Sequence, residues 1–129
     1  MMNETLQTLL NRRSIRSYKG EQVSRDDLNQ ILKAGTYAAS GSGKQSAVMV
    51  VVQDPEIIAK MSKMNAKVMG VTSDPFYGAP TVIVVFADKN VSTAVEDGSL
   101  VIGNLMNAAY SIGVSSCWIH RAREVFESE

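Results

Sequence analysis

The sequence predicts one α/β or α+β domain in which helices and strands pack in layers. Three observations support this fold class. Helical and strand-like apolar patterns interleave along the chain, the length of 129 residues is that of one domain, and the chain contains no repeat, linker or low-complexity tract. With 45% apolar and 20% charged residues the composition is that of a globular protein, which excludes a disordered or fibrous chain.

Two helices are predicted before the first strand, each beginning at a residue that can cap a helix. Asn3 precedes a stripe of leucines at helical spacing, Leu6, Leu9 and Leu10. Ser24 begins the second helix, with Asp27 at its third position. This helix is expected to stop near Ser40–Gly43, because two glycines and two serines favour loop geometry.

Three apolar runs predict strands, at residues 47–52, 81–87 and 114–119. The first run does not alternate with polar residues, so we expect it to be covered on both faces. The second is also expected to be a buried strand. Helices and strands then alternate, which excludes an all-helical bundle.

The remaining helices follow these strands. Asp54 and Pro55 form an N-cap and first position, opening a helix with five residues expected to point inward, Ile57, Ile58, Met61, Met64 and Val68. A long helix is expected from about residue 92 to 112, ended by Gly113, and another begins at 121–127. Adjacent apolar pairs such as Val101 and Ile102 indicate that these helices contact more than one surface, a partner subunit included.

Charge and composition exclude several functions. Thirteen basic residues balance thirteen acidic ones, which argues against binding to nucleic acid or to a membrane surface through bulk charge. The single cysteine and single histidine exclude an intrachain disulfide and a zinc site built from several such ligands. The apolar runs are far shorter than the roughly 20 residues of a membrane span, so we expect a soluble cytoplasmic protein.

The densest polar motif is the run Arg12-Arg13-Ser14-Ile15-Arg16, directly after the first helix. Guanidinium groups are planar, charged donors suited to phosphate and to carbonyl edges, so the run can form an anion or cofactor cradle. The alternative is a solvated helix end whose cations complement the helix dipole. Taken alone, the motif favours this second interpretation.

A second motif, residues 40–46, reads Ser-Gly-Ser-Gly-Lys-Gln-Ser. Its glycines allow a ligand to approach the backbone, and Lys44 and Gln45 add donors. The motif lacks the spacing of a P-loop and of a dinucleotide fingerprint. Alone it is more simply a helix-to-strand connection.

Other candidate residues favour structural roles. Cys117 reads as a small residue in an apolar strand, and His120 has no local partner for nucleophilic catalysis. Asp54, Asp74 and Asp97 read as cap, turn and helix residues rather than as a catalytic carboxylate pair.

Together, the two motifs resemble the flavin-binding signatures of the nitroreductase family. The run 12–16 matches the family's Arg-Arg-Ser-x-Arg element, and residues 39–45 resemble its Pro-Ser-Gly-x-Asn-x-Gln loop, with Ala39 and Gly43 replacing the usual Pro and Asn. Residues 78–85 resemble its Ala-Pro-x-x-Ile-Val-Val strand, and 96–119 its long helix and next strand. The resemblance runs in family order from about Leu6 to Ile119.

The resemblance implies one domain, residues 1–129, with a mixed, mostly antiparallel central sheet flanked by helices, in an obligate homodimer that binds FMN at its interface. It implies an FMN-dependent oxidoreductase passing hydride from NADH or NADPH to nitroaromatics, quinones or similar electrophiles by a ping-pong mechanism. The cofactor-binding residues so implied are Arg12, Arg13, Ser14, Arg16, Ser40, Gly43 and Gln45. No catalytic side chain and no metal is expected, because the flavin supplies the redox chemistry.

Within this resemblance, Arg12, Ser14 and Arg16 would hold the ribityl-phosphate end and Arg13 would reach the pyrimidine edge. Ser40, Gly43 and Gln45 would contact the same FMN from the other subunit. Similar proteins continue beyond the position of Glu129, so the chain is expected to be C-terminally short. That expectation favours one alternative, a non-catalytic flavin-binding or interaction module. Another alternative, a phosphate-binding regulatory domain, rests only on the arginine run and the Ser/Gly loop.

Overall fold

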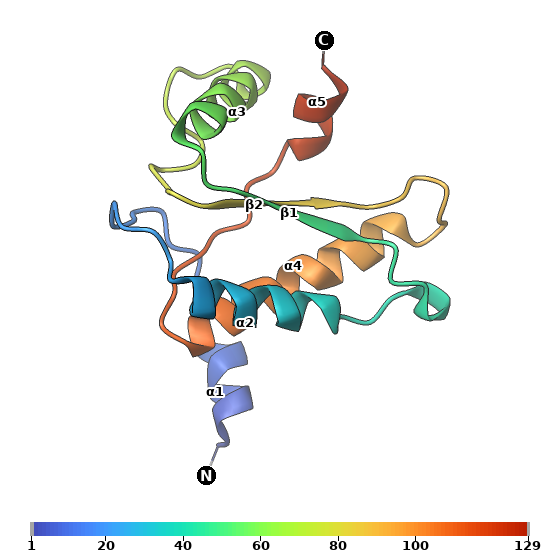
Figure 1. Ribbon diagram of the computed structural model, residues 1–129. Helices are drawn as coiled ribbons and strands as arrows, with labels where there is room; N and C mark the ends of the chain where they lie inside the picture. The colour runs from blue at the N-terminus through green and yellow to red at the C-terminus, as the bar shows by residue number, and fades with distance from the viewer. Residues whose placement is uncertain (1, 129) are drawn as a thin grey trace.

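A central antiparallel sheet separates two layers of helices in the computed structural model, which describes residues 2–128 (Figure 1). In chain order the elements are α1 (Glu4–Asn11), α2 (Arg25–Thr36), the short 3-10 helix η1 (Gly41–Gly43), β1 (Val48–Val52), α3 (Pro55–Met69), β2 (Val82–Phe86), α4 (Ala94–Ser111) and α5 (Ala122–Glu127). α3 and α5 lie on one side of the sheet, and α2 and α4 on the other. The predicted α+β class, with helices flanking an antiparallel sheet, is confirmed.

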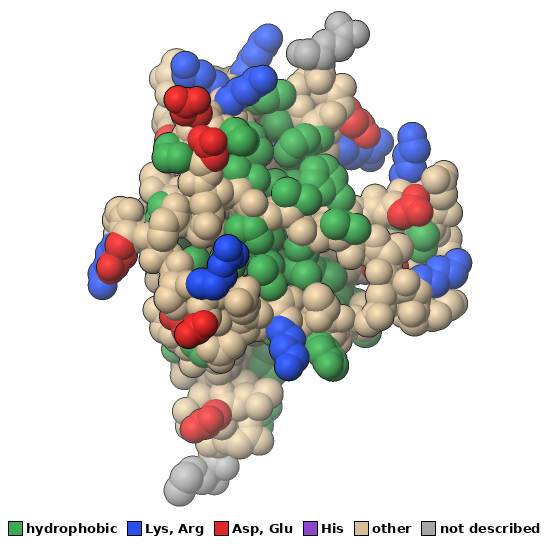
Figure 2. Space-filling model, viewed as in Figure 1, with side chains coloured by type: hydrophobic (Ala, Val, Ile, Leu, Met, Phe, Trp, Pro, Cys, Tyr) green, Lys and Arg blue, Asp and Glu red, His purple; other side chains and the backbone are tan. Residues whose placement is uncertain are grey.

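The sheet consists of β1 and β2, paired so that Val48 lies opposite Phe86 and Val52 opposite Val82. The prediction that β1 is covered on both faces is wrong, because Val48 is 58% exposed and Val50 is also exposed. A small cluster of Met61, Phe76 and Val84 covers this face only toward the Val52 end. Apolar side chains are consequently gathered over the middle of the face shown in Figure 2.

The predicted third strand, residues 114–119, is not a strand in this structure. A strand requires a ladder of hydrogen bonds to a neighbour, which an apolar run alone does not provide. Its backbone accepts one bond from the first segment of the chain, from Ile15 N to Ser116 O at 3.0 Å. The apolar residues of this run nevertheless pack against the core. Val114 contacts the cluster that contains Leu105, and Ile119 contacts the cluster that contains Met61.

The predicted helix starts are confirmed by their capping bonds. Asn3 Oδ1 accepts from Leu6 N at 2.9 Å, and Ser24 Oγ accepts from Asp27 N at 3.1 Å. Asp54 Oδ1 accepts from Glu56 N at 2.8 Å. At the end of α4, Gly113 has a φ of 81°, as expected of a residue that stops a helix in the left-handed conformation.

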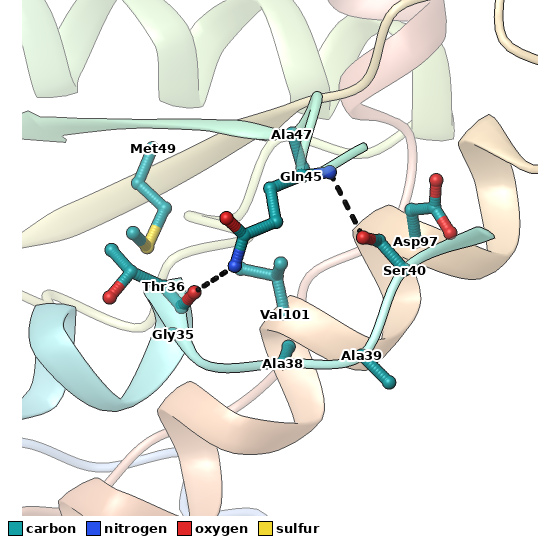
Figure 3. A pocket seen from close by; sticks show the side chains of 10 residues that line it. All are labelled: Gly35, Thr36, Ala38, Ala39, Ser40, Gln45, Ala47, Met49, Asp97 and Val101. Carbon is teal, nitrogen blue, oxygen red and sulfur yellow. Dashed lines mark hydrogen bonds between the residues drawn. The ribbon is translucent and has the colours of Figure 1, made fainter. Parts of the chain in front are cut away.

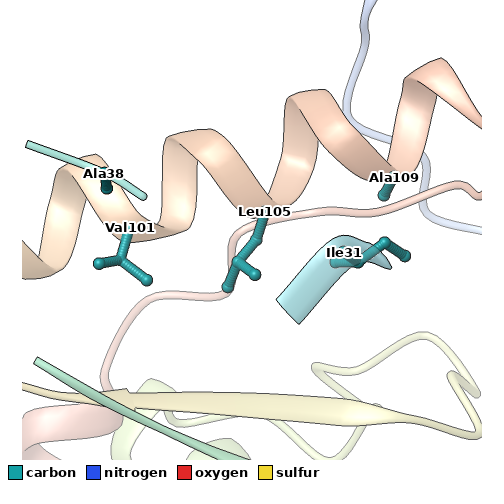
Figure 4. Close-up of a cluster of buried hydrophobic side chains, with 5 residues drawn as sticks. All are labelled: Ile31, Ala38, Val101, Leu105 and Ala109. Atoms are coloured by element: carbon teal, nitrogen blue, oxygen red, sulfur yellow. The ribbon is translucent and has the colours of Figure 1, made fainter. Parts of the chain in front are cut away.

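The larger hydrophobic core lies between α2, α4 and the sheet (Figure 4) and consists of Ile31, Ala38, Val101, Leu105 and Ala109. α2 approaches closely because residue 35 is glycine. A Cβ there would lie 2.7 Å from Met49 Sδ and 2.8 Å from Leu105 Cδ2. This packing fixes where α2 ends, and therefore where residues 40–46 begin.

Not every predicted apolar face is buried. On α3, Ile57 and Val68 were expected to point inward and are exposed, while Asn65 occupies a buried position. The leucine stripe of α1 is exposed along its whole length, and α1 has no buried residue. No helix within residues 2–128 has the length and apolarity needed to cross a membrane.

Candidate functional site

The two polar motifs lie at opposite ends of α2 (Figure 1). The segment after α1 passes the amino end of α2, whereas the loop of residues 40–46 lies beyond its carboxyl end. Each motif lines a hollow of its own, of about 310 Å³ beside Arg12 and Arg13 and about 190 Å³ beside Ser40 and Gln45. One copy of the chain therefore does not bring the two sets of predicted cofactor-binding residues together.

The first hollow lies between the end of α1 and the turn after α4. Its walls include Tyr110 and residues 113–116 as well as Arg12 and Arg13. The bond from Ile15 N to Ser116 O holds the arginine segment against this turn. Ser14 and Arg16 lie on the exposed side of the same segment.

The neighbouring arginines Arg12 and Arg13 differ in their hydrogen bonding. Arg13 Nη1 donates to the carbonyl oxygens of Leu10 and Arg12, both at 2.8 Å, and so caps the end of α1. Arg12 Nη1 is buried and has no hydrogen-bond partner among the described residues. A buried, unpaired guanidinium nitrogen is costly, so this atom is suited to receive an anionic or carbonyl oxygen of a ligand.

Tyr18 follows the arginine segment and lies near Cys117, in the run of residues 114–119. Burial raises the pKa of its phenol, nearby Cys117 adds to the rise, and Arg16 opposes it. The Tyr18 hydroxyl donates to the carbonyl oxygen of Ile15. This contact closes the turn that presents Ser14 and Arg16.

The second motif forms a tight loop with unusual backbone angles. Ser42, Gly43 and Gln45 have φ values of 54°, 64° and 49°, a region that residues with a Cβ rarely adopt. Such conformations persist only where surrounding contacts hold them, and they are frequent at binding sites. The loop is therefore held in shape by its contacts.

Two of these contacts come from Gln45, whose side chain crosses the second hollow (Figure 3). Its Nε2 donates to Thr36 O at 3.1 Å, and its backbone N donates to Ser40 Oγ at 2.9 Å. Ser40 and Gln45 thus close the loop on itself. Asn104 of α4 donates to Ala34 O at 2.9 Å, so side-chain amides satisfy two carbonyl groups at the end of α2.

Asp97 is a residue of this site that the sequence interpretation placed only on a helix. It is 2% exposed and lines the second hollow. Its Oδ1 accepts from Gly41 N and its Oδ2 from Thr93 Oγ1, both at 2.9 Å. An acidic residue in the first turn of a helix is ordinarily explained by its favourable interaction with the helix dipole. No pattern in the sequence therefore connected Asp97 with Gly41, which lies 56 positions earlier in the chain.

The other candidates keep structural roles. Asp54 is the N-cap of α3, and Asp74 accepts from Phe76 N and Gly78 N in the turn before β2. The carbonyl oxygen of His120 accepts from the buried side chain of Asn65. Within residues 2–128, no cluster of three or more His, Cys, Asp or Glu side chains is suited to hold a metal ion.

These features define an α+β protein with one hollow lined by Arg12 and Arg13 and one shaped loop at the far end of α2. The Nitroreductase family model matches residues 9–125, and the chain belongs to the nitroreductase family. The expected family and fold are confirmed.

Among curated proteins, the chain is 36% identical to an Archaeoglobus fulgidus protein assigned the name NADH dehydrogenase/NAD(P)H nitroreductase, over 92% of this chain and 68% of that one. It is 35% identical to a Bacillus subtilis FMN reductase [NAD(P)H], over 74% of this chain and 37% of the relative. The chain therefore spans about two thirds of one relative and little more than a third of the other.

Among solved structures, a nitroreductase with bound FMN from Bacteroides fragilis matches with a TM-score of 0.82 and 31% identity, covering 97% of this chain and 77% of that one. An FMN-dependent nitroreductase from Clostridium difficile matches with a TM-score of 0.86 and 34% identity, covering 94% and 62%. The arrangement of sheet, α2 and α4 is thus shared with flavin-dependent proteins.

Proposed function

We propose that this chain acts as an NAD(P)H-dependent flavin oxidoreductase that binds FMN between two copies of itself. The observation that carries the proposal is the buried, unpartnered Nη1 of Arg12, which lies on the family's Arg-Arg-Ser-x-Arg element. FMN supplies the kind of group that this atom lacks, because its phosphate and its ring carbonyls are strong acceptors.

The residues of the first cradle fit the phosphate-bearing end of FMN. Arg12, Ser14 and Arg16 would bind the ribityl-phosphate chain with two cations and a hydroxyl. Arg13 would reach the pyrimidine edge of the flavin, where a cation favours the anionic reduced form. In the free chain one nitrogen of Arg13 already caps α1.

The shaped loop would contact the same FMN from the second copy through Ser40, Gly43 and Gln45. Support comes from the separation of the two motifs, which line different hollows at opposite ends of α2. A ligand held by both requires a second chain. Gly43 would contact the flavin through its backbone, whereas the family usually has an asparagine here, whose side-chain amide is available for the contact.

The surface of the chain supports the proposed homodimer. Leu6, Leu9 and Leu10 form an exposed stripe on α1, with Leu10 57% exposed. An amphipathic helix whose apolar side is in water gains free energy by burying that side against another surface. A second copy is the partner that would also complete the cofactor site.

Bound FMN would supply the hydride chemistry, taken from NADH or NADPH and passed to a nitroaromatic, quinone or similar electrophile in a ping-pong cycle. The chain itself binds and orients the flavin.

The test is to purify the chain, add FMN, remove free flavin by gel filtration and record the visible spectrum. We expect flavin absorbance to elute with the protein and to bleach on anaerobic addition of NADH or NADPH. Protein that elutes without flavin would contradict the proposal. Bound flavin that neither nucleotide bleaches would indicate a flavin-binding module instead of an enzyme.

A further inference from the structure

We propose that Asp97 is a positioning residue that holds the loop of residues 40–46 in the shape needed for cofactor binding. This inference rests on the proposed function. In it, Asp97 does not contact the flavin itself. It acts on the backbone of Gly41 and, through Thr93, on the start of α4.

The carboxylate joins two elements that are far apart in sequence. Asp97 Oδ1 accepts from Gly41 N at 2.9 Å, at the first residue of η1, and Oδ2 accepts from Thr93 Oγ1 at 2.9 Å, at the N-cap of α4. Since Asp97 is 2% exposed, water does not compete for these bonds. A buried carboxylate with both oxygens bonded fixes the first residue of the loop relative to α4.

The same contact requires glycine at position 41. A Cβ at Gly41 would overlap Thr93 Oγ1 and lie 2.8 Å from Thr93 Cγ2. The backbone at Gly41 therefore lies directly against Thr93, the N-cap of α4, and the bond to Asp97 forms at this close approach. Within the loop of residues 40–46, the residues with positive φ are 42, 43 and 45, and all three come after Gly41.

The side-chain hydrogen bonds of Ser40 and Gln45 do not reach α4. Gln45 and Ser40 bond the loop to itself and to α2, whereas Asp97 is the carboxylate that receives a backbone N–H of η1. Loss of Asp97 would leave Gly41 N without its partner beside a hollow. We expect the loop then to sample other shapes and the flavin to lose its contacts from this side.

The test compares Asp97→Ala and Asp97→Asn with a matched control, Asp54→Ala, in the whole chain. Asp54 also accepts backbone N–H groups, from Glu56 and Ile57, but at the far end of β1. The FMN dissociation constant is measured by quenching of flavin fluorescence, at a temperature where every variant is folded. Amide hydrogen exchange at Gly41 is measured in the flavin-free protein.

Asp97→Ala should raise the FMN dissociation constant about tenfold or more and remove protection of the Gly41 amide, because a buried donor loses its partner. Asp97→Asn should restore most of both properties, since its amide can accept from Gly41 and donate to Thr93. Asp54→Ala should lower the melting temperature without changing either. Wild-type affinity in Asp97→Ala, or an equal loss in Asp54→Ala, would overturn the inference.

Two further outcomes are distinct. If Asp97→Ala does not fold, the test uses Thr93 instead. Thr93→Val removes one of the two bonds to Asp97 and should weaken FMN binding, whereas Thr93→Ser keeps the hydroxyl and should bind FMN as the wild type does. Equal FMN affinities in these two variants would overturn the inference. If the wild-type chain takes up no FMN, the proposed function fails and the cofactor role of Asp97 fails with it. Gly41 exchange then still shows whether Asp97 holds the loop.

Discussion

Arg12 is the residue on which the candidate site most depends. Truncating it removes a partly buried cation whose Nη1 has no hydrogen-bond partner within residues 2–128. Arg12→Ala should therefore weaken FMN binding by about 2–5 kcal/mol, as measured for one partner of a buried charge contact. Titration of the chain with FMN, followed by flavin fluorescence, gives the change in affinity.

The control for this prediction is Arg25→Ala, which removes an exposed arginine at the start of α2. Its affinity for FMN should equal that of the wild type. An unchanged affinity in Arg12→Ala would remove Arg12 from the site.

At Asp74 a single carboxylate organises the turn before β2. Burial acts to raise its pKa, but bonds from Ser62 Oγ, Phe76 N and Gly78 N outweigh burial and lower the pKa below the ordinary value. An aspartate with a depressed pKa in the folded state stabilises that state above the unfolded pKa and loses the effect as pH falls through the folded pKa.

Asp74→Asn should thus lower the free energy of unfolding near neutral pH, and the difference from wild type should shrink below about pH 4. Urea denaturation at a series of pH values measures it. A difference that stays constant down to pH 2 would show that the charge of Asp74 contributes nothing.

At the scale of the elements, the glycine that ends α3 offers a clean test. Gly70 has a φ of 78°, and a Cβ there would meet nothing within 4 Å. Gly70→Ala should therefore destabilise the fold by about 1–2 kcal/mol through backbone strain alone. Gly20→Ala, at a position with equal space but an ordinary φ, should leave the urea midpoint nearly unchanged. Equal midpoints for both variants would contradict the strain argument.

Local signals in the sequence predicted the helices well, because caps such as Asn3, Ser24 and Asp54 act on amides two or three residues away. The strand predictions succeeded only in part, because a strand forms only where a distant segment of the chain pairs with it. The run 114–119 has strand composition but no ladder, and β1 was expected to be buried on a face that leaves Val48 in water.

The candidate site shows the same division between local and distant information. The arginine segment and the loop became candidates only through their joint resemblance to the family's motifs, because each motif alone favoured a structural role. In the structure each lines a hollow. Asp97 was missed because its contact with Gly41 depends on how α4 packs against α2, which no short pattern encodes. That the two motifs share one cofactor remains a prediction.

The whole molecule is predicted to dimerise through surfaces that include the leucine stripe of α1. Leu6→Glu tests this without harming the helix, because glutamate is favoured in a first turn and at the third position after an N-cap. Burying a charge in place of a leucine should raise the dimer dissociation constant about tenfold or more. Sedimentation equilibrium measures this constant.

Thr5→Glu places the same charge on the neighbouring position of α1, beside the stripe rather than in it, and should change dimerisation little. A chain that sediments as a monomer at all concentrations, with FMN bound, would contradict the dimer.

The most direct measurement of the central claim is flavin binding by a mixed dimer, in which one copy carries Arg12→Ala and the other Gly41→Ala. Each change should disable its own motif, the second because a Cβ at residue 41 collides with Thr93. If each site takes its arginines from one copy and its loop from the other, one of the two sites in the mixed dimer is intact. We predict half the wild-type FMN content at wild-type affinity; a mixed dimer that binds no FMN would contradict a site shared between copies.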